Sequence, residues 1–415
     1  MKTDISAPVN FYDSWSHKVF VQNKCTNAKT GETLYYRPLD HEPVTADSNK
    51  RVHLVIFGMS DMGISLAVQA AHICHFPNFV TKGIKTRITF IDKDADNKII
   101  SLKTRLHNFL ENIDYFYTCL NQQIQTNKNP KENKFTDIEL EFIKANLGDS
   151  QVNECLLKEY LLKSVNEKTN CLTVAIATPD SASSLAFALN LPEEIFDYGA
   201  SVLVRQDNLH DIATMLSKEK GADIYNKYKN MRPFGMVNDF SDMEEADFLI
   251  PMMIKYVYDN TKFNKEHIIK DFDIEKIKEN WNNWDPEQNV SALKAANRYA
   301  ADFIYTKQRS LNIKEGIDLD EDQSKLAAKM EHNRWLTEKL LTGFRAPTKQ
   351  ESALITKENR EYYKSLFIHP DIRPYEELEE DAENLNVKIY DINISNSLPY
   401  MLKAFRFYKS SGGKP

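Results

Sequence analysis

The sequence predicts an α/β fold in which a mostly parallel β-sheet, with helices on both faces, is followed by an α-helical region. Three observations predict it. Apolar, β-branched runs alternate with helical patterns between residues 51 and 205, and short connections join them, which is typical of parallel strands covered on both faces. The first run leads into a turn that contains glycine. Beyond residue 240, apolar residues recur at the spacing of a helix rather than of a strand.

Length and composition are those of an ordinary globular protein of two or three domains. The chain has 415 residues, of which 42% are apolar and 27% charged. Its net charge of -7 argues against broad nucleic-acid binding, because a surface that neutralises phosphates is rich in Lys and Arg. The start lacks the apolar segment of a secretion signal, and Phe248–Tyr258, the most apolar later stretch, is too short to span a membrane. Together with scattered cysteines, which indicate reduced thiols, these features predict a cytoplasmic protein without nucleic-acid partners or direct membrane insertion.

Residues 1–50 form an N-terminal extension. Within it, Lys18–Val21 and Thr33–Tyr36 are rich in β-branched and aromatic residues and flank a turn-like segment that ends in Gly31. Two such runs around a glycine turn predict a β-hairpin, which we expect to be appended to the main sheet.

The first β-α-β unit runs from Val52 to Asp92. An apolar strand leads into a turn with Gly58 at its first position and Gly63 at its sixth, and a helical pattern then leads into a second strand that ends on Asp92. This is the opening unit of a dinucleotide-binding, or Rossmann, fold. Gly58 lets the backbone turn sharply off the strand, and Gly63 lets the helix pack close to the sheet.

The same turn predicts how a nucleotide is held. The helix N-terminus, where Asp61 and Met62 lie, presents N–H groups to a phosphate, and Asp92 can accept hydrogen bonds from a ribose diol. Ser60 replaces the middle glycine of the motif. Its side chain narrows the approach of a pyrophosphate, although its hydroxyl can donate to one. A purely structural turn stays open as the alternative, because the same strand, turn and helix also occur in sheets that bind nothing there.

The alternation continues along the chain. We expect a helix at Ile99–Leu120, an exposed insertion at Asn121–Lys134, strands at Ile138–Ile143, Cys171–Ala177 and Ser201–Arg205, and helices at Val152–Val165 and from Ser181 through Leu189. Ligands bind such sheets at the carboxyl ends of the strands. Gly58, Asp92, Asp149 and Thr178 should therefore lie at one crevice.

These motifs resemble a known family. Gly58-x-Ser60-x-x-Gly63, Asp92, Gly148-Asp149, Ala177-Thr178 and Val202–Arg205 look like the nucleotide-binding domain of bacterial potassium-uptake regulators, the Trk-type or regulator-of-conductance domain, over residues 51–240. The resemblance implies a sensor of NAD(H) or another adenine nucleotide that reports to a membrane transporter or an effector chain. It implies cofactor-binding roles for Gly58, Ser60, Asp61, Met62, Gly63, Asp92, Asp149, Thr178 and Arg205.

Residues beyond 240 are predicted to be helical. The clearest segments are Met243–Asn260, Ser291–Lys307 and Leu398–Tyr408. The acidic run Asp318–Asp322 should cap the N-terminus of the next helix, because anions are stabilised there. We divide this part into a helical connector, residues 241–320, and a second domain, residues 321–415.

The second domain resembles the Ryr domain, the repeat named after the ryanodine receptor. The resemblance rests on the aromatic and basic helix Leu326–Trp335, which continues to Lys339 and Phe344, and on the proline-bounded segment His369–Leu378. Residues from Trp281 to Asn312 look like a degenerate copy. The spacing of Glu331, Trp335 and Lys339 places them on one helix face, with His332 beside it.

The residues of this match suggest a ligand site. Trp335, Phe344 and Tyr375 can form an aromatic pocket for a flat ligand, with phosphate bound by Arg334, Lys339 or Arg373. His332 and His369 complete the candidate set. The alternative reading stays open, because such aromatics and histidines also occur as ordinary core residues of small helical domains.

The sequence favours binding over turnover. It contains no G-x-S-x-G nucleophile, P-loop lysine or H-E-x-x-H motif, and the proton-transfer candidates His210 and Lys218 lie in unremarkable contexts. His72, Cys74 and His75 do not share one helix face, so we expect no metal site. We therefore predict a nucleotide-binding sensor that forms a homo-oligomer. An NAD-dependent oxidoreductase or NAD-consuming enzyme, and a scaffold with a vestigial Rossmann fold, remain alternatives.

Overall fold

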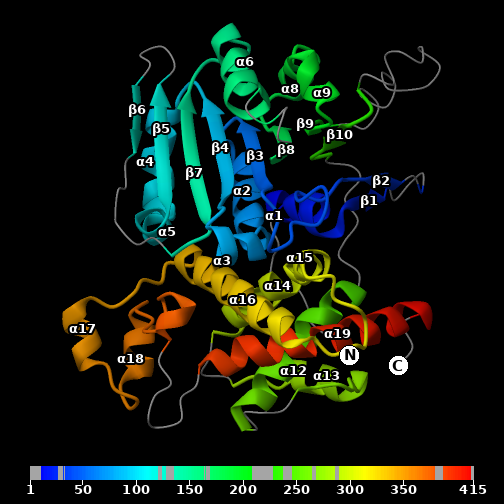
Figure 1. Cartoon of the computed structure of the whole chain (residues 1–415), viewed down its shortest axis with the longest axis vertical. Helices are drawn as coiled ribbons and strands as arrows, with labels where there is room; N and C mark the ends of the chain where they lie inside the picture. The colour runs from blue at the N-terminus through cyan, green and yellow to red at the C-terminus, as the bar shows by residue number, and fades with distance from the viewer. Residues whose placement is uncertain are drawn as a thin grey trace. The chain divides into compact units, whose positions relative to one another are not determined.

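The computed structural model describes residues 11–26, 31, 33–119, 124–127, 135–162, 164, 169–207, 228–236, 245–263, 268–285, 289–378 and 387–412 (Figure 1). The chain forms two compact units. The first, called the sheet unit, comprises Met1–Pro43, Ser48–Cys74 and Ile84–Asp242. The second, called the helical unit, comprises Val44–Asp47, His75–Gly83 and Met243–Pro415.

The sheet unit is built on one large β-sheet. Its strands lie in the order β10-β9-β8-β3-β4-β7-β5-β6, and every neighbouring pair is parallel except β5 and β6. The strands are β3 Arg51–Phe57, β4 Thr86–Asp92, β5 Asp114–Cys119, β6 Ile124–Asn127, β7 Ile138–Lys144, β8 Asn170–Ile176, β9 Ser201–Arg205 and β10 Met231–Phe234. Without the β5–β6 pair at one edge, the order β7-β4-β3-β8-β9-β10 is 3-2-1-4-5-6, the order of doubly wound dinucleotide-binding folds. The predicted α/β class is confirmed.

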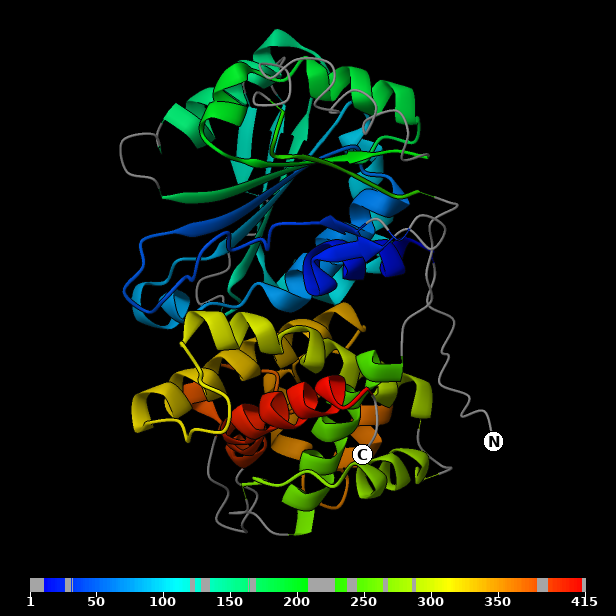
Figure 2. The ribbon, with the colours of Figure 1, turned by 90° about the vertical axis from the view of Figure 1, so that its right-hand side faces the viewer.

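Helices cover both faces of this sheet (Figure 2). Successive side chains of a strand point to opposite faces. Phe57 of β3 contacts Phe187 of α8, with ring centroids 4.6 Å apart, whereas its neighbour Ile56 faces Gly63 of α2. Burial on both sides explains why β3 and β8 read as nearly continuous apolar runs. The helices of this unit are α1 Phe11–His17, η1 Lys18–Gln22, α2 Asp61–Ile73, α4 Ala95–Arg105, α5 His107–Asn112, α6 Ser150–Leu156, η3 Leu157–Leu162, α8 Ser181–Leu189 and α9 Glu193–Asp197.

Two predictions for this unit were wrong in part. The expected helix over Ile99–Leu120 ends at Asn112, and Asp114–Cys119 is strand β5, because its run of aromatic and β-branched residues favours a strand. The expected insertion after it contributes β6, which pairs antiparallel with β5.

The N-terminal hairpin also differs from the prediction. Its strands are β1 Lys24–Thr26 and β2 Thr33–Tyr35, which pair with each other as a separate two-stranded sheet rather than joining the main one. Residues Lys18–Val21, expected as the first strand, lie in the π-helical turn η1. Val19 and Phe20 are buried there with Trp15 of α1, so burial of a helical face overrides their β propensity.

The helical unit is formed by helices around one apolar core, as predicted for the C-terminal region. The core draws on residues from Leu249 to Tyr408. An acidic N-cap, Asp320, forms a capping box with Gln323 at the start of α16, as the acidic run predicted. The last helix is longer than expected and contains Pro399. The helices are α3 Pro77–Lys82, η5 Glu245–Phe248, α12 Leu249–Phe263, α13 Ile274–Asn282, α14 Val290–Asp302, α15 Ile304–Ser310, α16 Glu321–Leu341, α17 Lys349–Leu354, α18 Arg360–Ser365, η6 Tyr375–Glu377 and α19 Lys388–Ser410.

Across the described ranges, none of the helices is both long enough and apolar enough to cross a membrane.

Candidate functional site

The strand order places a topological switch point beside β3. The chain leaves β3 for β4 and β7 on one side, and later returns to β8 on the other side. Ligands of such sheets bind outside the carboxyl ends of the strands at this point. The structure places Gly58 directly after β3, Asp92 at the end of β4, Thr178 just beyond β8 and Arg205 at the end of β9. We call the region at these four strand ends the crevice.

Both glycines of the turn after β3 are required by close backbone approach. Gly58 has φ +98°, and a Cβ there would lie 3.1 Å from the Ala177 carbonyl oxygen. A Cβ on Gly63 would lie 2.3 Å from the Gly58 carbonyl oxygen and 3.1 Å from Cγ2 of Ile56. The two glycines therefore allow β3 to end against β8 and α2 to pack on the strand.

Ser60 is the N-cap of α2. Its Oγ accepts a hydrogen bond from the Gly63 N–H at 3.2 Å and donates to the Ala177 carbonyl at 2.5 Å. The hydroxyl thus ties the turn after β3 to the end of β8. Within the described part of the chain, no group accepts a hydrogen bond from the N–H groups of Asp61 and Met62, the first two residues of α2. These two N–H groups remain as donors for an anion.

The side chains of Asp61 and Met62 differ in exposure. Met62 is fully buried, and its Cε would lie 3.6 Å from a Cβ on Gly235, in the loop after β10. Asp61 is exposed, and its Oδ1 lies 3.8 Å from Nη1 of Arg105 on α4. Binding of a phosphate here would use their backbone groups.

Asp92 is already engaged by three donors. Its Oδ2 accepts from the Met59 N–H at 2.8 Å and from Nζ of Lys98 at 2.6 Å, and its Oδ1 accepts from the Asp94 N–H at 2.9 Å. Burial raises the pKa of Asp92, but the hydrogen bonds from Lys98, Asp94 and Met59 outweigh it and lower that pKa below its ordinary value. A carboxylate has about four acceptor positions, so a ribose diol would have to compete with Lys98.

The other predicted crevice residues also hold the strand ends in place. The Thr178 hydroxyl donates to the Asp180 carbonyl at 3.0 Å, and Nη1 of Arg205 donates to the Thr178 carbonyl at 3.2 Å. Nε of Arg205 is buried and has no hydrogen-bond partner among the described residues. Asp149 caps α6 by accepting from the Gln151 N–H at 3.0 Å. It follows β7, which is separated from β3 by β4.

A second candidate site lies in the helical unit, where the structure gathers five predicted residues into one aromatic cluster. The His332 and Trp335 rings are stacked, with centroids 5.6 Å apart and planes at 22°. His369 meets Trp335 edge-on at 4.8 Å, Tyr375 lies 5.7 Å from His332, and Phe344 lies 6.1 Å from His369. These five residues, from α16, η6 and the segments between them, are called the aromatic cluster.

The two histidines of this cluster carry opposite pKa shifts. Burial lowers the pKa of His332, but its contact with Asp391, with Nδ1 and Oδ2 3.3 Å apart, raises it above the ordinary value. His332 Nε2 also lies 2.8 Å from the Arg373 carbonyl oxygen. Burial and the charges of Lys364 and Lys339 hold the pKa of His369 well below its ordinary value. The two imidazoles of one cluster thus have pKa values displaced in opposite directions.

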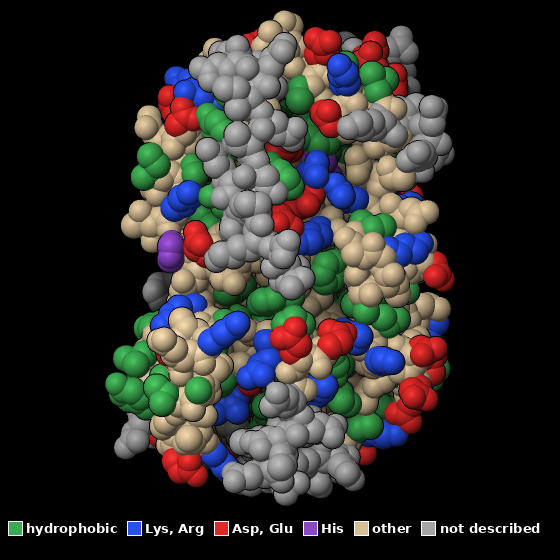
Figure 3. All heavy atoms as spheres, turned by 60° about the vertical axis from the view of Figure 1, so that its left-hand side comes forward, with side chains coloured by type: hydrophobic (Ala, Val, Ile, Leu, Met, Phe, Trp, Pro, Cys, Tyr) green, Lys and Arg blue, Asp and Glu red, His purple; other side chains and the backbone are tan. Residues whose placement is uncertain are grey.

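Cations surround the aromatic cluster. Nζ of Lys339 lies 5.8 Å from the centre of the Trp335 ring and 5.5 Å from that of Phe344. Lys364 and Arg360 act on His369 with the same sign as Lys339. Figure 3 shows one face of the helical unit, on which Lys and Arg side chains lie beside exposed hydrophobic ones, with Asp and Glu side chains among them. Arg373, by contrast, closes its own loop by donating from Nε to the Pro370 carbonyl at 2.9 Å.

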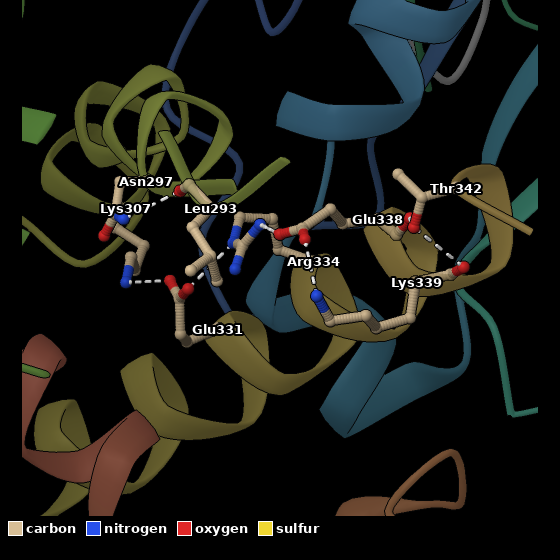
Figure 4. Close-up of polar contacts among 8 residues, drawn as sticks. All are labelled: Leu293, Asn297, Lys307, Glu331, Arg334, Glu338, Lys339 and Thr342. Carbon is tan, nitrogen blue, oxygen red and sulfur yellow. Dashed lines mark hydrogen bonds and ion pairs between the residues drawn. The ribbon is translucent and has the colours of Figure 1, made fainter. Parts of the chain in front are cut away.

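Arg334, also predicted for this site, is held by ion pairs inside the helical unit. It is 3% exposed, and its guanidinium donates from Nε to Glu331 and from Nη1 to Glu338, both at 2.7 Å (Figure 4). Glu331 also bonds Nζ of Lys307 at 2.6 Å, and Glu338 bonds Lys339 at 3.0 Å. These two donors of the guanidinium are therefore used inside the helical unit, and phosphate binding by Arg334 stays a prediction.

The five charges, Lys307, Glu331, Arg334, Glu338 and Lys339, form a buried ion-pair network that sequence reasoning missed. Burial raises the pKa of Glu338, but Lys339 and Arg334 lower it to about 2. The carboxylate of Glu331, which the sequence placed on the same helix face as Trp335, is bonded to the Lys307 ammonium. The spacing of Glu331, Arg334 and Glu338, three and four residues apart, was the available signal.

Comparisons of the chain with protein-family models, with curated proteins and with solved structures found no match. Within the described residues, no group of three or more His, Cys, Asp or Glu side chains is arranged to hold a metal ion. The proton-transfer candidates His210 and Lys218 lie outside the described residues. A functional assignment therefore depends on the geometry of the crevice and of the aromatic cluster.

Proposed function

We propose that this chain is a nucleotide-binding sensor. The crevice binds NAD(H) or another adenine nucleotide, and the aromatic cluster binds a second ligand or a partner. The observation that carries the proposal is the glycine turn at the switch point of a sheet with strand order 3-2-1-4-5-6, with the N–H groups of Asp61 and Met62 unclaimed by the described residues.

The phosphate and the ribose of a nucleotide each have a partner in the crevice. A phosphate accepts from the two N–H groups at the N-terminus of α2, where the helix dipole also favours negative charge. Arg205, whose buried Nε has no partner in the described part of the chain, supplies a second donor. The pair of Asp92 and Lys98 lies where this fold recognises the ribose.

The aromatic cluster suits a planar, anionic ligand. Half-buried faces of Trp335, Phe344 and Tyr375 offer stacking surface. Lys339, Lys364 and Arg360 supply positive charge, and each is also paired with a carboxylate, of Glu338, Glu361 and Asp371 respectively.

The resemblance to Trk-type regulators supports a regulatory rather than a catalytic role. We propose that the protein acts in the cytoplasm as a homo-oligomer and reports to a transporter or effector chain. Coupling requires that each ligand bind one conformation of the protein more tightly than another.

Isothermal titration calorimetry of the full chain with NAD, NADH, ATP, ADP-ribose and cyclic nucleotides tests the proposal. At least one is expected to bind, and Gly63→Val should abolish binding because its side chain meets the Gly58 carbonyl. Arg205→Gln, which leaves the turn intact, should weaken binding about tenfold or more, as for loss of a charge-assisted hydrogen bond. If none of the ligands binds the correctly folded wild-type protein, the proposal is wrong.

One observation favours a second candidate, a scaffold with a vestigial nucleotide fold. Ser60 and Asp92, which would meet the ligand, are both used as internal ties. A scaffold predicts no heat of binding with any nucleotide and no effect of Arg205→Gln beyond stability.

A further inference from the structure

The end of β4 presents a cation where a dinucleotide-binding fold normally presents an acid. Asp92 is 5% exposed, whereas the side chain of Lys98, bonded to it at 2.6 Å, is 37% exposed. Lys98 comes from the first turns of α4, which begins at Ala95. A ligand that approaches this strand end therefore meets the ammonium group before the carboxylate.

We propose that Lys98 makes the crevice selective for a nucleotide whose ribose carries a phosphate, such as NADP(H), over the same nucleotide with a free ribose diol. The inference rests on the proposed function of the crevice and names the ligand class that it takes.

The bonds of Asp92 argue against diol recognition. A ribose diol is held by donating two hydrogen bonds to a free carboxylate. Here Oδ2 already accepts from Met59 and Lys98, and Oδ1 accepts from Asp94. A diol would have to displace the ammonium and leave it without its anion, at the cost of a charge-assisted hydrogen bond.

The same bonds favour a phosphate. Asp92 takes one of the three N–H groups of the Lys98 ammonium, which leaves donors for the oxygens of a phosphate monoester. The phosphate adds negative charge beside an ammonium that keeps its carboxylate partner, so no buried group loses a bond. Basic side chains near this strand end are the known way in which the fold accommodates a 2′-phosphate.

The charge of Asp92 opposes a phosphate, but its carboxylate is buried behind the ammonium of Lys98, and the other charges nearby do not add to it. Asp96, the other acid at the start of α4, is bonded to Lys144 and to the Tyr117 hydroxyl. Lys93 and Asp94 are both exposed and contribute opposite charges. Lys98 is thus the cation placed to contact the ribose phosphate.

Calorimetry of the full chain with NAD, NADP, 5′-AMP and adenosine 2′,5′-bisphosphate tests the inference. Wild type should bind NADP about tenfold or more tightly than NAD, and adenosine 2′,5′-bisphosphate about tenfold or more tightly than 5′-AMP. Lys98→Gln should remove that difference, whereas Lys103→Gln, an exposed lysine on the same helix that lies over the Tyr115 ring, should keep it.

Three results overturn the inference in distinguishable ways. Equal affinity of wild type for NAD and NADP, or tighter binding of NAD, contradicts it and leaves the proposed function standing. A preference for NADP that survives Lys98→Gln assigns the selectivity to another residue. Absence of binding to every nucleotide refutes the proposed function as well.

Discussion

The buried ion-pair network on α16 yields a stability prediction whose size follows from burial. Glu331→Gln keeps the shape of the side chain but removes the negative charge that faces the Lys307 ammonium at 2.6 Å. The two side chains are 1% and 0% exposed, so water cannot replace the lost partner. Removing one partner of a buried pair costs about 3–5 kcal/mol. We expect about 3 kcal/mol here, because Arg334 keeps its bond to Glu338.

The assay is thermal unfolding of the full chain, read by circular dichroism. A loss of about 3 kcal/mol should lower the melting temperature of the helical unit by roughly 6–12 °C. Adding Lys307→Met to Glu331→Gln should recover part of the loss, because the ammonium left without its anion is then gone. A double-mutant cycle should give a coupling of about 1–3 kcal/mol between these two positions.

The matched control is Glu361→Gln, which breaks an exposed ion pair with Lys364 at 2.7 Å. Glu361 is 81% exposed, so its loss should barely change the melting temperature. The reasoning is refuted if Glu331→Gln costs no more than this control, or if Lys307→Met deepens the loss rather than relieving it.

Two further predictions concern the candidate sites. The pKa of His332 is raised by Asp391, and burial raises the pKa of Asp391 as well. Stability from this pair is present below the unfolded His pKa of about 6.5 and is lost as pH rises through the folded value. Melting temperatures between about pH 6 and 9 should therefore fall less steeply in His332→Gln than in wild type; parallel curves would contradict the prediction. Ser60→Gly should cost about 1 kcal/mol, chiefly the lost bond to the Ala177 carbonyl, and should tighten nucleotide binding in calorimetry, since it removes the atoms that narrow the turn. Weaker binding by Ser60→Gly would show instead that the hydroxyl contacts the ligand.

Local signals predicted the first β-α-β unit well. The role of Gly63 depends on atoms a few residues away, the Gly58 carbonyl and Cγ2 of Ile56, and the positive φ of Gly58 is likewise a local requirement of the turn, although the Ala177 carbonyl that it meets is distant in sequence. Such constraints leave their mark in a short stretch of sequence. The acidic cap at Asp320 was predictable for the same reason, because its partner Gln323 lies three residues along the helix.

Features that depend on distant partners were not predictable. Arg334 is the neighbour of Trp335 in the sequence, but its direction is set by Glu331 and Glu338, whose network is anchored by Lys307 on α15. Strand β5 carried a local signal, its aromatic and β-branched residues, but its parallel pairing with β7, which places it in the main sheet, depends on a strand later in the chain.

The ties made by Ser60 and Asp92 change how mutations of the crevice should be read. Ser60 joins the turn after β3 to β8, and Asp92 joins it to β4 through the Met59 N–H. Asp92→Asn should therefore loosen the turn. In calorimetry it should lower the affinity for every nucleotide by a similar factor, rather than lowering only the affinity for nucleotides with a free ribose diol. Lys98→Gln leaves the bond from Met59 in place, so it should change the ratio of affinities instead. A selective loss of diol ligands in Asp92→Asn would show that the carboxylate exchanges Lys98 for the ribose, and would contradict the role assigned to Lys98.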